Sequence, residues 1–501
     1  MPSAMNSDTA ELVLSDNGRE LVAAVDRTQI GRLEAAPASV APVPSWLARL
    51  RADPVRMLAV RDSWRALWSS RVLVWTVGVG TVLVLGFGPE RKAFDPPGVT
   101  SGFGWLGNLL AAPAARWDAA WYLVIARYGY RPDLGITSRT AFFPLYPLGL
   151  RTITWFGVPP VLAGVLLSAA AFALALYGIH RLTTLELTRS ARPTLAGDRV
   201  ADAARLAVLL VAFAPMAFFF SAVYSESLYL ALSVGLFWSA RNGRWMWVGV
   251  LGALAGATRS TGLVLVLPAL MIYLYGPRED RPPDRPVDRA RPRRRRLPAR
   301  ALQGVPAWVS PRYRLRRDAL WFALLPAGAL LYGAGLALAG GNPLAPLHAQ
   351  EAWNRYFAGP YVGVWDGMKA AFEGARQLLS GQRHHIYFPT GHDSPFVEAG
   401  HNLILLAFLA AAVPAVVGVV RRLPLAYGVY VVAALALPLS DPASSQPLMS
   451  LPRFLVVLFP LFIWLAAWLA ERPRLQRPAL ALSAVMMAFF LAQFATWHWV
   501  A

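Results

Sequence analysis

Cysteine is absent from this chain of 501 residues, and charged residues are scarce. Without cysteine, the chain can form no disulfide, no thiolate nucleophile and no cysteine metal site. Only 15% of the residues are charged, whereas 56% are hydrophobic. Such a balance excludes a soluble globular enzyme, and it excludes disorder over most of the length. The 19 tryptophans suit a protein that meets two lipid–water interfaces, so we predict a multi-span membrane protein.

Other familiar features are also missing. Residues 1–44 are polar and contain no apolar core, so we expect no signal peptide there and predict a disordered cytoplasmic tail. No nucleotide-binding glycine loop is present, which excludes an ATP-driven pump. Lysine is nearly absent, because all but Lys92 and Lys369 of the 48 basic residues are arginine. Together with the abundant alanine, this bias is typical of a GC-rich bacterial genome.

Apolar runs dominate what is present. Eleven of them approach the ~20 residues that a spanning helix needs, so we predict an all-α polytopic fold of about eleven spans. The runs cover residues 72–88, 160–180, 204–221, 226–240, 245–257, 261–276, 319–340, 402–420, 423–439, 453–470 and 479–498. Before the first run, residues 45–71 mix aromatic and apolar residues with six arginines, which predicts an amphipathic helix on the membrane surface. The membrane domain then occupies residues 72–501.

The net charge of +20 raises the question of a nucleic-acid partner. We expect none, because arginines on cytoplasmic loops orient membrane proteins. With the N-terminus inside, 35 basic residues lie inside and 13 lie outside. The Arg- and Pro-rich loop 277–318 is then cytoplasmic, disordered and close to anionic lipid headgroups. Two long loops, 89–158 and 341–401, lie outside, and residues 245–276 must cross twice, with a turn at 258–261.

The first long outer loop carries an acid among aromatic residues, in the stretch RWDAAWYLVIARYGY from residue 116. On a helix, Asp118 lies one turn from Tyr122, and a partly desolvated carboxylate can act as a general base. The alternative is a structural ion pair with Arg116 or Arg127. The aromatic residues of this stretch that could bind a substrate are Trp117, Trp121 and Tyr122.

Two further outer segments combine polar and aromatic residues. FFPLYP at residues 142–147 contains Tyr146 between two prolines, which shape a turn at the membrane entry or a simple connector. Tyr224 and Glu226 lie in a segment that joins two spans, and an ionisable group at such an edge suggests a functional site. The alternative is that Ser225 caps the next helix and that Glu226 favours its first turn.

Two arginines lie on the side that the orientation rule disfavours. Arg453 begins an apolar run on the outer side, and Arg259 lies in the turn at 258–261. A cation at a helix start opposes the helix dipole, so we expect an anionic group near each arginine. That group is either a lipid phosphate or a structural carboxylate.

Five of the seven histidines lie in or beside the second outer loop, which raises the question of a metal site. They are His348, His384, His385, His392 and His401. None of them forms a pair at i, i+4, and the set lacks zinc-type spacing. We therefore predict no metal site and no cofactor.

The ordered set of motifs resembles the PIG-V family, the second GPI mannosyltransferases and their bacterial relatives, among the GT-C membrane glycosyltransferases. The resemblance spans roughly residues 70–470. Five motifs carry it: WDxxxYxxIAxxGY at 117–130, FFPLYP at 142–147, YSES at 224–227, RSTG at 259–262, and SLPRF at 450–454 with a following FP. All five lie on the outer side of the charge-derived topology.

The resemblance implies a polyprenyl- or dolichyl-phosphate-mannose donor, a site on the extracytoplasmic face of the plasma membrane, and an inverting transfer to a lipid or glycan acceptor. It also implies that Asp118 is the catalytic carboxylate. Arg259 and Arg453 could stabilise the phosphate that leaves. Two alternatives remain: a GT-C enzyme for another lipid-linked sugar, and a transporter or flippase of lipid-linked sugar, which would place its polar residues near the midplane.

Overall fold

The computed structural model describes residues 53–89, 94–131, 137–189, 197–284, 311–384, 386 and 394–500. The tail predicted for residues 1–44 lies outside the described residues, as does the centre of the basic loop, residues 285–310. Residues 54–500 belong to one compact unit, and the description below concerns that unit alone.

Helices are the only regular elements in the described residues, which confirms the all-α prediction. The α-helices are α2 (Pro54–Leu85), α3 (Gly104–Ala111), α4 (Ala119–Tyr128), α5 (Leu145–Trp155), α6 (Pro160–Thr188), α7 (Gly197–Ala212), α8 (Glu226–Arg241), α9 (Trp245–Gly256), α10 (Val266–Tyr275), α11 (Ala327–Leu338), α12 (Ala345–His348), α13 (Pro360–Ser380), α14 (Pro395–Arg422), α15 (Leu425–Ser440), α16 (Leu451–Val456), α17 (Phe459–Ala470) and α18 (Pro473–Ala495). Short 3-10 helices are η3 (Thr137–Ala141), η4 (Ala217–Phe220), η5 (Ser260–Leu265), η6 (Arg317–Leu324) and η7 (Ala349–Trp353).

Five helical segments of the described chain are long and apolar enough to cross a membrane, by length and composition. They are α2, α6, η6 continued by α11, α14 and α18. Four shorter apolar helical segments, of 10–17 residues, are α9, η5 with α10, α15 and α17. These segments agree with a polytopic membrane protein, and the total of eleven spans stays a prediction.

Helix α2 corrects the boundary that the sequence suggested at residues 71 and 72. No glycine or proline interrupts the chain there, so one helix of 32 residues runs through the junction. Arg71 is buried, and its guanidinium donates to the carbonyl oxygens of Ala217 (3.1 Å) and Ala212 (3.3 Å). The described part of the 45–71 segment is therefore continuous with the first apolar run and packs one face into the protein.

Two other apolar runs are interrupted. Helix α7 ends at Ala212 within the run 204–221, because Pro215 has no backbone N–H to continue it. The run 453–470 is divided into α16 and α17 at Leu458, two residues before Pro460. Both runs therefore form shorter helices than the sequence suggested.

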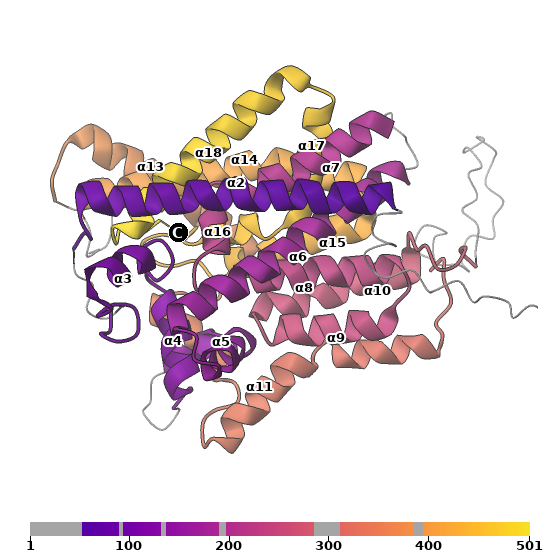
Figure 1. Ribbon diagram of the computed structural model, residues 1–501, viewed down its shortest axis with the longest axis horizontal. Helices are drawn as coiled ribbons and strands as arrows, with labels where there is room; N and C mark the ends of the chain where they lie inside the picture. The colour runs from indigo at the N-terminus through magenta and orange to yellow at the C-terminus, as the bar shows by residue number, and fades with distance from the viewer. Residues whose placement is uncertain are drawn as a thin grey trace, which may run out of the picture. The chain divides into compact units, whose positions relative to one another are not determined.

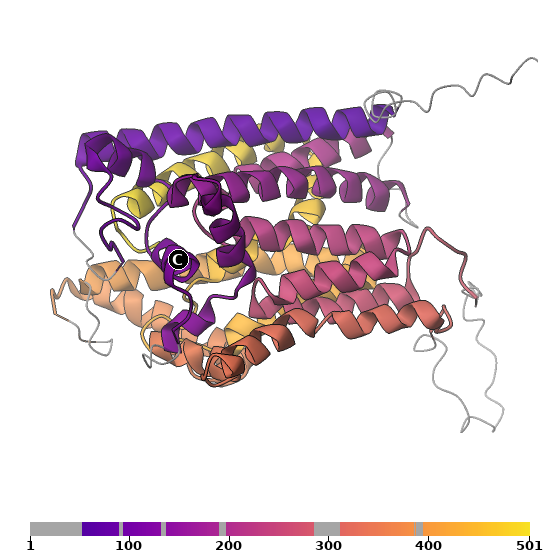
Figure 2. The same cartoon turned by 60° about the horizontal axis from the view of Figure 1, so that its bottom comes forward.

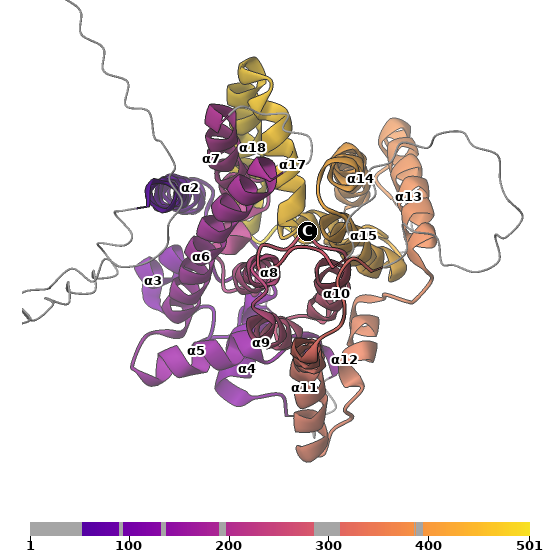
Figure 3. The same ribbon diagram turned by 90° about the vertical axis from the view of Figure 1, so that its right-hand side faces the viewer.

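The long helices of this unit pack side by side. Helix α6 contacts α2, α7 and α8, and α13 lies along α14 (Figures 1 and 3). The start of α2 and the base of the basic loop lie at one end of these helices, whereas α3, α4, α5 and the C-terminus lie at the other (Figure 2). The segments predicted to be outside thus gather at the end away from the basic loop.

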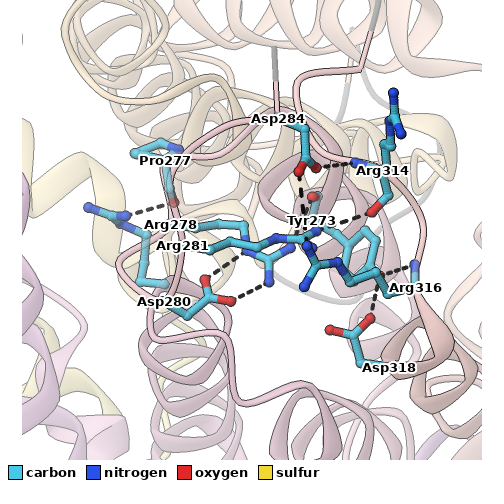
Figure 4. Close-up of polar contacts among 10 residues, drawn as sticks. Tyr273, Pro277, Arg278, Asp280, Arg281, Asp284, Arg314, Arg316 and Asp318 are labelled. Carbon is cyan, nitrogen blue, oxygen red and sulfur yellow. Dashed lines mark hydrogen bonds and ion pairs between the residues drawn. The ribbon is translucent and has the colours of Figure 1, made fainter. Parts of the chain in front are cut away.

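Polar contacts join the two ends of the basic loop (Figure 4). The Asp284 carboxylate accepts a hydrogen bond from the backbone N–H of Arg314 at 2.8 Å, and the Arg281 guanidinium donates to the Arg314 carbonyl at 3.1 Å. The Tyr273 hydroxyl donates to Asp318 at 2.5 Å and accepts from the backbone N–H of Arg316 at 3.0 Å. The described residues on either side of 285–310 are therefore held together.

Candidate active site

A cavity of about 260 Å³ lies among the segments at the end away from the basic loop. Four of the predicted site residues line it: Asp118, Tyr122, Arg259 and Arg453. They come from the first outer loop, the turn between α9 and α10, and the start of α16, so segments that are far apart in sequence meet at this cavity.

Ion pairs connect the charged residues at this cavity. Arg453 Nη1 lies 2.7 Å from Asp118 Oδ2, and Arg453 Nε lies 3.1 Å from Glu226 Oε1. Arg259 Nη1 lies 2.6 Å from the same Glu226 oxygen. We call Asp118, Arg453, Glu226 and Arg259 the four-residue network. Its two carboxylates balance its two guanidinium groups.

Backbone strain and a tyrosine hydroxyl position Asp118. The preceding residue, Trp117, has a φ of +53°, a conformation that a bulky side chain adopts only when its surroundings impose it. The Tyr224 hydroxyl accepts from the backbone N–H of Asp118 at 3.1 Å and donates to the Arg116 carbonyl at 3.0 Å. Trp117 itself packs edge-on against Trp497 and Trp499, whose ring centroids lie 5.7 and 5.2 Å away. These contacts fix Asp118 at the start of α4.

Arg453 is positioned by the loop that precedes α16. Ser450 has a φ of +67° at the N-terminal end of that helix. The buried Arg355 guanidinium donates to the carbonyl oxygens of Met449 (2.8 Å) and Asp441 (3.1 Å), which holds both ends of the 441–449 loop. Burial, and next the charge of Arg453, lowers the pKa of Arg355 to about 10.

The local ion pairs considered for Asp118 do not form. Arg116 donates to the Ala495 carbonyl at 3.3 Å and lies over the Trp497 ring at 4.6 Å, and burial lowers its pKa to about 10. Arg127 donates instead to the Gly98 carbonyl at 3.1 Å. The partner of Asp118 is Arg453, which lies 335 residues away in the sequence.

Glu226 was interpreted either as part of a functional site or as a residue of the first helical turn, and the structure shows features of both. It occupies the first turn of α8, as the capping interpretation expected, but the Ser225 side chain makes no capping hydrogen bond. The Ser225 hydroxyl lies 2.8 Å from the Tyr122 hydroxyl instead. Burial, and next the charge of Glu226, raises the pKa of Tyr122 to about 12, so Tyr122 stays protonated at neutral pH.

The partners of Arg259 and Arg453 are carboxylates. Glu226 is only 1% exposed and faces both Arg259 and Arg453, which is the structural-carboxylate alternative stated for these arginines. Each guanidinium has five N–H donors, so these ion pairs leave donors for a further anion.

Four predicted substrate contacts do not line the cavity, and their role in substrate binding stays a prediction. They are Trp117, Trp121, Tyr146 and Tyr224. Tyr146 is fully buried, its hydroxyl lies 2.8 Å from that of Ser168, and its ring packs edge-on against Tyr122 at 5.1 Å. Trp121 stacks on Phe142, with ring centroids 5.8 Å apart. Glu226 likewise lies behind the lining residues.

The FFPLYP and RSTG motifs are joined through the backbone. The N–H of Leu145 donates to the Ala257 carbonyl at 2.9 Å, just before the turn that carries Arg259. Phe142 and Phe143 line the cavity beside this junction. FFPLYP is thus both a connector and part of the cavity wall.

Several lining residues were not predicted. The charged ones are Arg355 and Asp441, and the aromatic ones include Trp353 and Trp499. The orientation rule that identified Arg453 could have found Arg355, because both are arginines on the outer side. No sequence signal marked Asp441, which follows α15 in a short loop.

The described histidines in or beside the second outer loop belong to no group that could hold a metal ion. His348 lies 3.4 Å from Glu351, and both side chains are exposed. His385 and His392 lie outside the described residues. Within the described ranges, no three His, Asp or Glu residues are grouped so that they could hold a metal ion.

Comparisons with known proteins match part of the chain. Residues 92–274 match the family described as Mannosyltransferase (PIG-V). Residues 92–274 are PIG-V-like. This segment contains Asp118, Glu226 and Arg259 of the four-residue network and ends before Arg453. The resemblance expected from the motifs is thus confirmed over a shorter range than residues 70–470.

Curated relatives agree with the PIG-V-like assignment. GPI alpha-1,6-mannosyltransferase 2 of Rattus norvegicus is 31% identical over 189 residues, which cover 35% of this chain and 35% of the relative. The Homo sapiens protein of the same name is 32% identical over 195 residues, with the same two shares. The matched part of the chain thus spans about a third of these relatives' length. No solved structure matches the chain.

Proposed function

We propose that this protein is an integral membrane mannosyltransferase that uses a polyprenyl-phosphate-mannose donor. The observation that carries the proposal is the four-residue network: Asp118, Arg259 and Arg453 line one cavity, and the buried Glu226 pairs with both arginines. Supporting it are the PIG-V-like match and the curated relatives named mannosyltransferases.

The proposed reaction is an inverting transfer to an acceptor hydroxyl. The acceptor oxygen attacks C1 of mannose from the face opposite the phosphate, so that a new C–O bond forms as the bond from C1 to the phosphate oxygen breaks. Asp118 accepts the hydroxyl proton, and polyprenyl phosphate leaves with the bonding electron pair. Asp118 suits this role because it lines the cavity and the network fixes its orientation.

Arg259 and Arg453 are the proposed contacts for the phosphate. Both line the cavity, and their ion pairs with Asp118 and Glu226 hold them in place before the donor arrives. Preorganised cations stabilise the charge that develops on a leaving phosphate without reorganisation during the reaction. The network is neutral when its carboxylates are ionised, so an incoming phosphate meets fixed donors rather than a strong net charge.

The membrane setting suits such a substrate. A polyprenyl chain keeps its phosphate at the membrane surface, and the cavity lies among segments at one end of the apolar helices. We propose that this end faces the extracytoplasmic side of a bacterial plasma membrane, because the arginine-rich loop lies at the other end. Membrane lipids and a lipid or glycan acceptor are the expected partners.

The two alternative functions, a transferase for another lipid-linked sugar and a flippase, would use the cavity differently. A transferase for another lipid-linked sugar would use the same network, so only the identity of the donor separates it from the proposal. A flippase would move the donor without breaking the bond to C1. The position of the cavity at one end of the helices favours a transferase over a site at the membrane midplane.

Asp118→Asn tests the proposed base. Asparagine keeps the shape and one oxygen but cannot take a proton, so turnover per folded molecule should fall by about 10²–10⁴. Donor binding should survive. Asp118→Glu should recover little activity, since the added methylene moves the carboxylate away from its proton. The measurement is transfer of labelled mannose from polyprenyl-phosphate-mannose in membranes, normalised to folded protein.

Two controls make this test decisive. Asp366→Asn makes the same substitution in α13, at a residue that does not line the cavity, and should leave turnover near normal. Near-normal turnover in Asp118→Asn, normalised to folded protein, would end the general-base assignment and leave Asp118 as the ion-pair partner of Arg453.

A further inference from the structure

A second carboxylate lines the cavity, and its ion pairing differs from that of Asp118. Asp441 lines the cavity just beyond the end of α15. Asp118 is held by Arg453 at 2.7 Å, whereas the Asp441 carboxylate takes part in no ion pair within 4 Å among the described residues. The two acids of one cavity are therefore not equivalent.

The backbone around Asp441 is fixed without using its carboxylate. Arg355 donates to the carbonyl oxygen of Asp441 at 3.1 Å and to that of Met449 at 2.8 Å. The Arg355 side chain is mostly buried, so these two bonds hold the loop tightly. The Asp441 carboxylate is left with its acceptor oxygens beside the cavity.

The electrostatic environment leaves this carboxylate short of stabilising partners. Burial raises the pKa of Asp441, and the nearby charge of Arg355 only partly opposes that effect. The charged groups around Arg355 are Arg453, Asp441 and Asp118, so the cavity holds both signs of charge close together. A partly desolvated acceptor of this kind gains most from a ligand that donates hydrogen bonds to it.

We propose that Asp441 and Arg355 form the acceptor subsite and that they bind an uncharged, hydroxyl-rich ligand such as a sugar ring. Asp441 accepts hydrogen bonds from ligand hydroxyls, and the remaining N–H groups of Arg355 donate to ligand oxygens. Trp353 lines the same cavity and offers an aromatic face to a sugar. This inference rests on the proposed function, because it names the acceptor class for the same site.

The charges of the subsite argue for a neutral ligand. An ammonium group near Asp441 would also lie near Arg355 and Arg453, and an anionic group near Arg355 would lie near Asp441 and Asp118. Either charge would meet a like charge at short range, whereas hydroxyls can donate to the carboxylate and accept from the guanidinium. The subsite therefore selects by hydrogen bonding rather than by net charge.

The test is ligand-observed saturation-transfer NMR on the purified full-length protein without a donor. The probes are methyl α-mannoside, which is neutral, and glucosamine, which carries an ammonium group. Methyl α-mannoside should bind the unmodified protein, and Asp441→Asn should weaken that binding about tenfold to a hundredfold, the loss expected for a hydrogen bond to a charged acceptor. Asp366→Asn is the matched control and should bind as the unmodified protein does. Thermal unfolding shows whether Asp441→Asn remains folded.

A kinetic measurement separates this subsite from the other assignments. With labelled polyprenyl-phosphate-mannose and octyl α-mannoside as acceptor, Asp441→Asn should raise the acceptor KM about tenfold or more while kcat changes little. Equal binding of methyl α-mannoside by Asp441→Asn and the unmodified protein would overturn the proposal, as would tighter binding of glucosamine. A fall in kcat of a hundredfold with unchanged KM would make Asp441 the base instead. Sugar binding without any mannose transfer would contradict the proposed function but not this subsite.

Discussion

Glu226 is a buried residue whose charge should matter for stability. Its side chain is 1% exposed, and it faces two arginines that are each 13% exposed. Glu226→Gln keeps the size of the side chain but removes its charge, which leaves Arg259 without its carboxylate partner and Arg453 with Asp118 alone. Breaking a buried ion pair by removing one partner costs about 3–5 kcal/mol, because it leaves an uncompensated buried charge. We expect a loss of that size in the free energy of unfolding.

The matched control for this prediction is Glu351→Gln. Glu351 is 73% exposed and lies beside His348, so the same substitution there should cost less than about 1 kcal/mol. Adding Arg259→Gln to Glu226→Gln removes the cation that the first substitution leaves without a carboxylate partner. The double variant should therefore lose less than the sum of the single variants, by about 0.5–3 kcal/mol.

The assay is unfolding in mixed detergent micelles, followed by circular dichroism for all four variants. Equal losses in the free energy of unfolding for Glu226→Gln and Glu351→Gln would refute the reasoning, because the charge of Glu226 would then not stabilise the fold. Strict additivity in the double variant would show that Glu226 and Arg259 do not interact.

Three further predictions concern packing, pH and topology. Gly328→Ala should destabilise the protein, because a Cβ there would collide with the Ala253 carbonyl of α9, whereas Gly335→Ala in the same helix meets nothing within 4 Å and should be neutral or stabilising in thermal unfolding. Because burial raises the pKa of Asp441, its ionised form costs stability once the pH rises above the ordinary value of 3.8. Asp441→Asn should therefore raise the free energy of unfolding at pH 7 and have little effect at about pH 3, and destabilisation at pH 7 would contradict this sign. Since the chain lacks cysteine, Ser380→Cys and Ala290→Cys give single labelling sites: an impermeant maleimide should label the first in intact cells and the second only after permeabilisation.

Sequence periodicity and composition predicted the class of fold but not every helix end. The runs of apolar residues correspond to helices because backbone groups in a membrane must be satisfied internally. The boundary at residue 71 was misplaced because charge was taken as a sign of exposure. Arg71 is buried, since carbonyl oxygens left unpaired near the end of α7 accept its N–H groups.

The sequence likewise predicted some residues of the candidate site but not their contacts. Asp118, Arg259 and Arg453 were identifiable because each is a charged residue in an unfavourable position, and such residues need partners. Their mutual pairing could not be predicted, because Asp118 and Arg453 lie 335 residues apart and several arginines were closer in sequence. Asp441 gave no signal at all, since its role depends on a loop that Arg355 holds through backbone carbonyls.

The central claim is that the cavity breaks the bond between mannose and a polyprenyl phosphate. The most direct measurement uses purified protein in nanodiscs with octyl α-mannoside as acceptor and labelled polyprenyl-phosphate donors that carry mannose, glucose or arabinose, and it follows the release of polyprenyl phosphate. The account predicts release from the mannose donor by the unmodified protein and a fall of about 10²–10⁴ in Asp118→Asn. Release of equal size in Asp118→Asn, preference for glucose or arabinose, or movement of intact donor across a bilayer without release would contradict it.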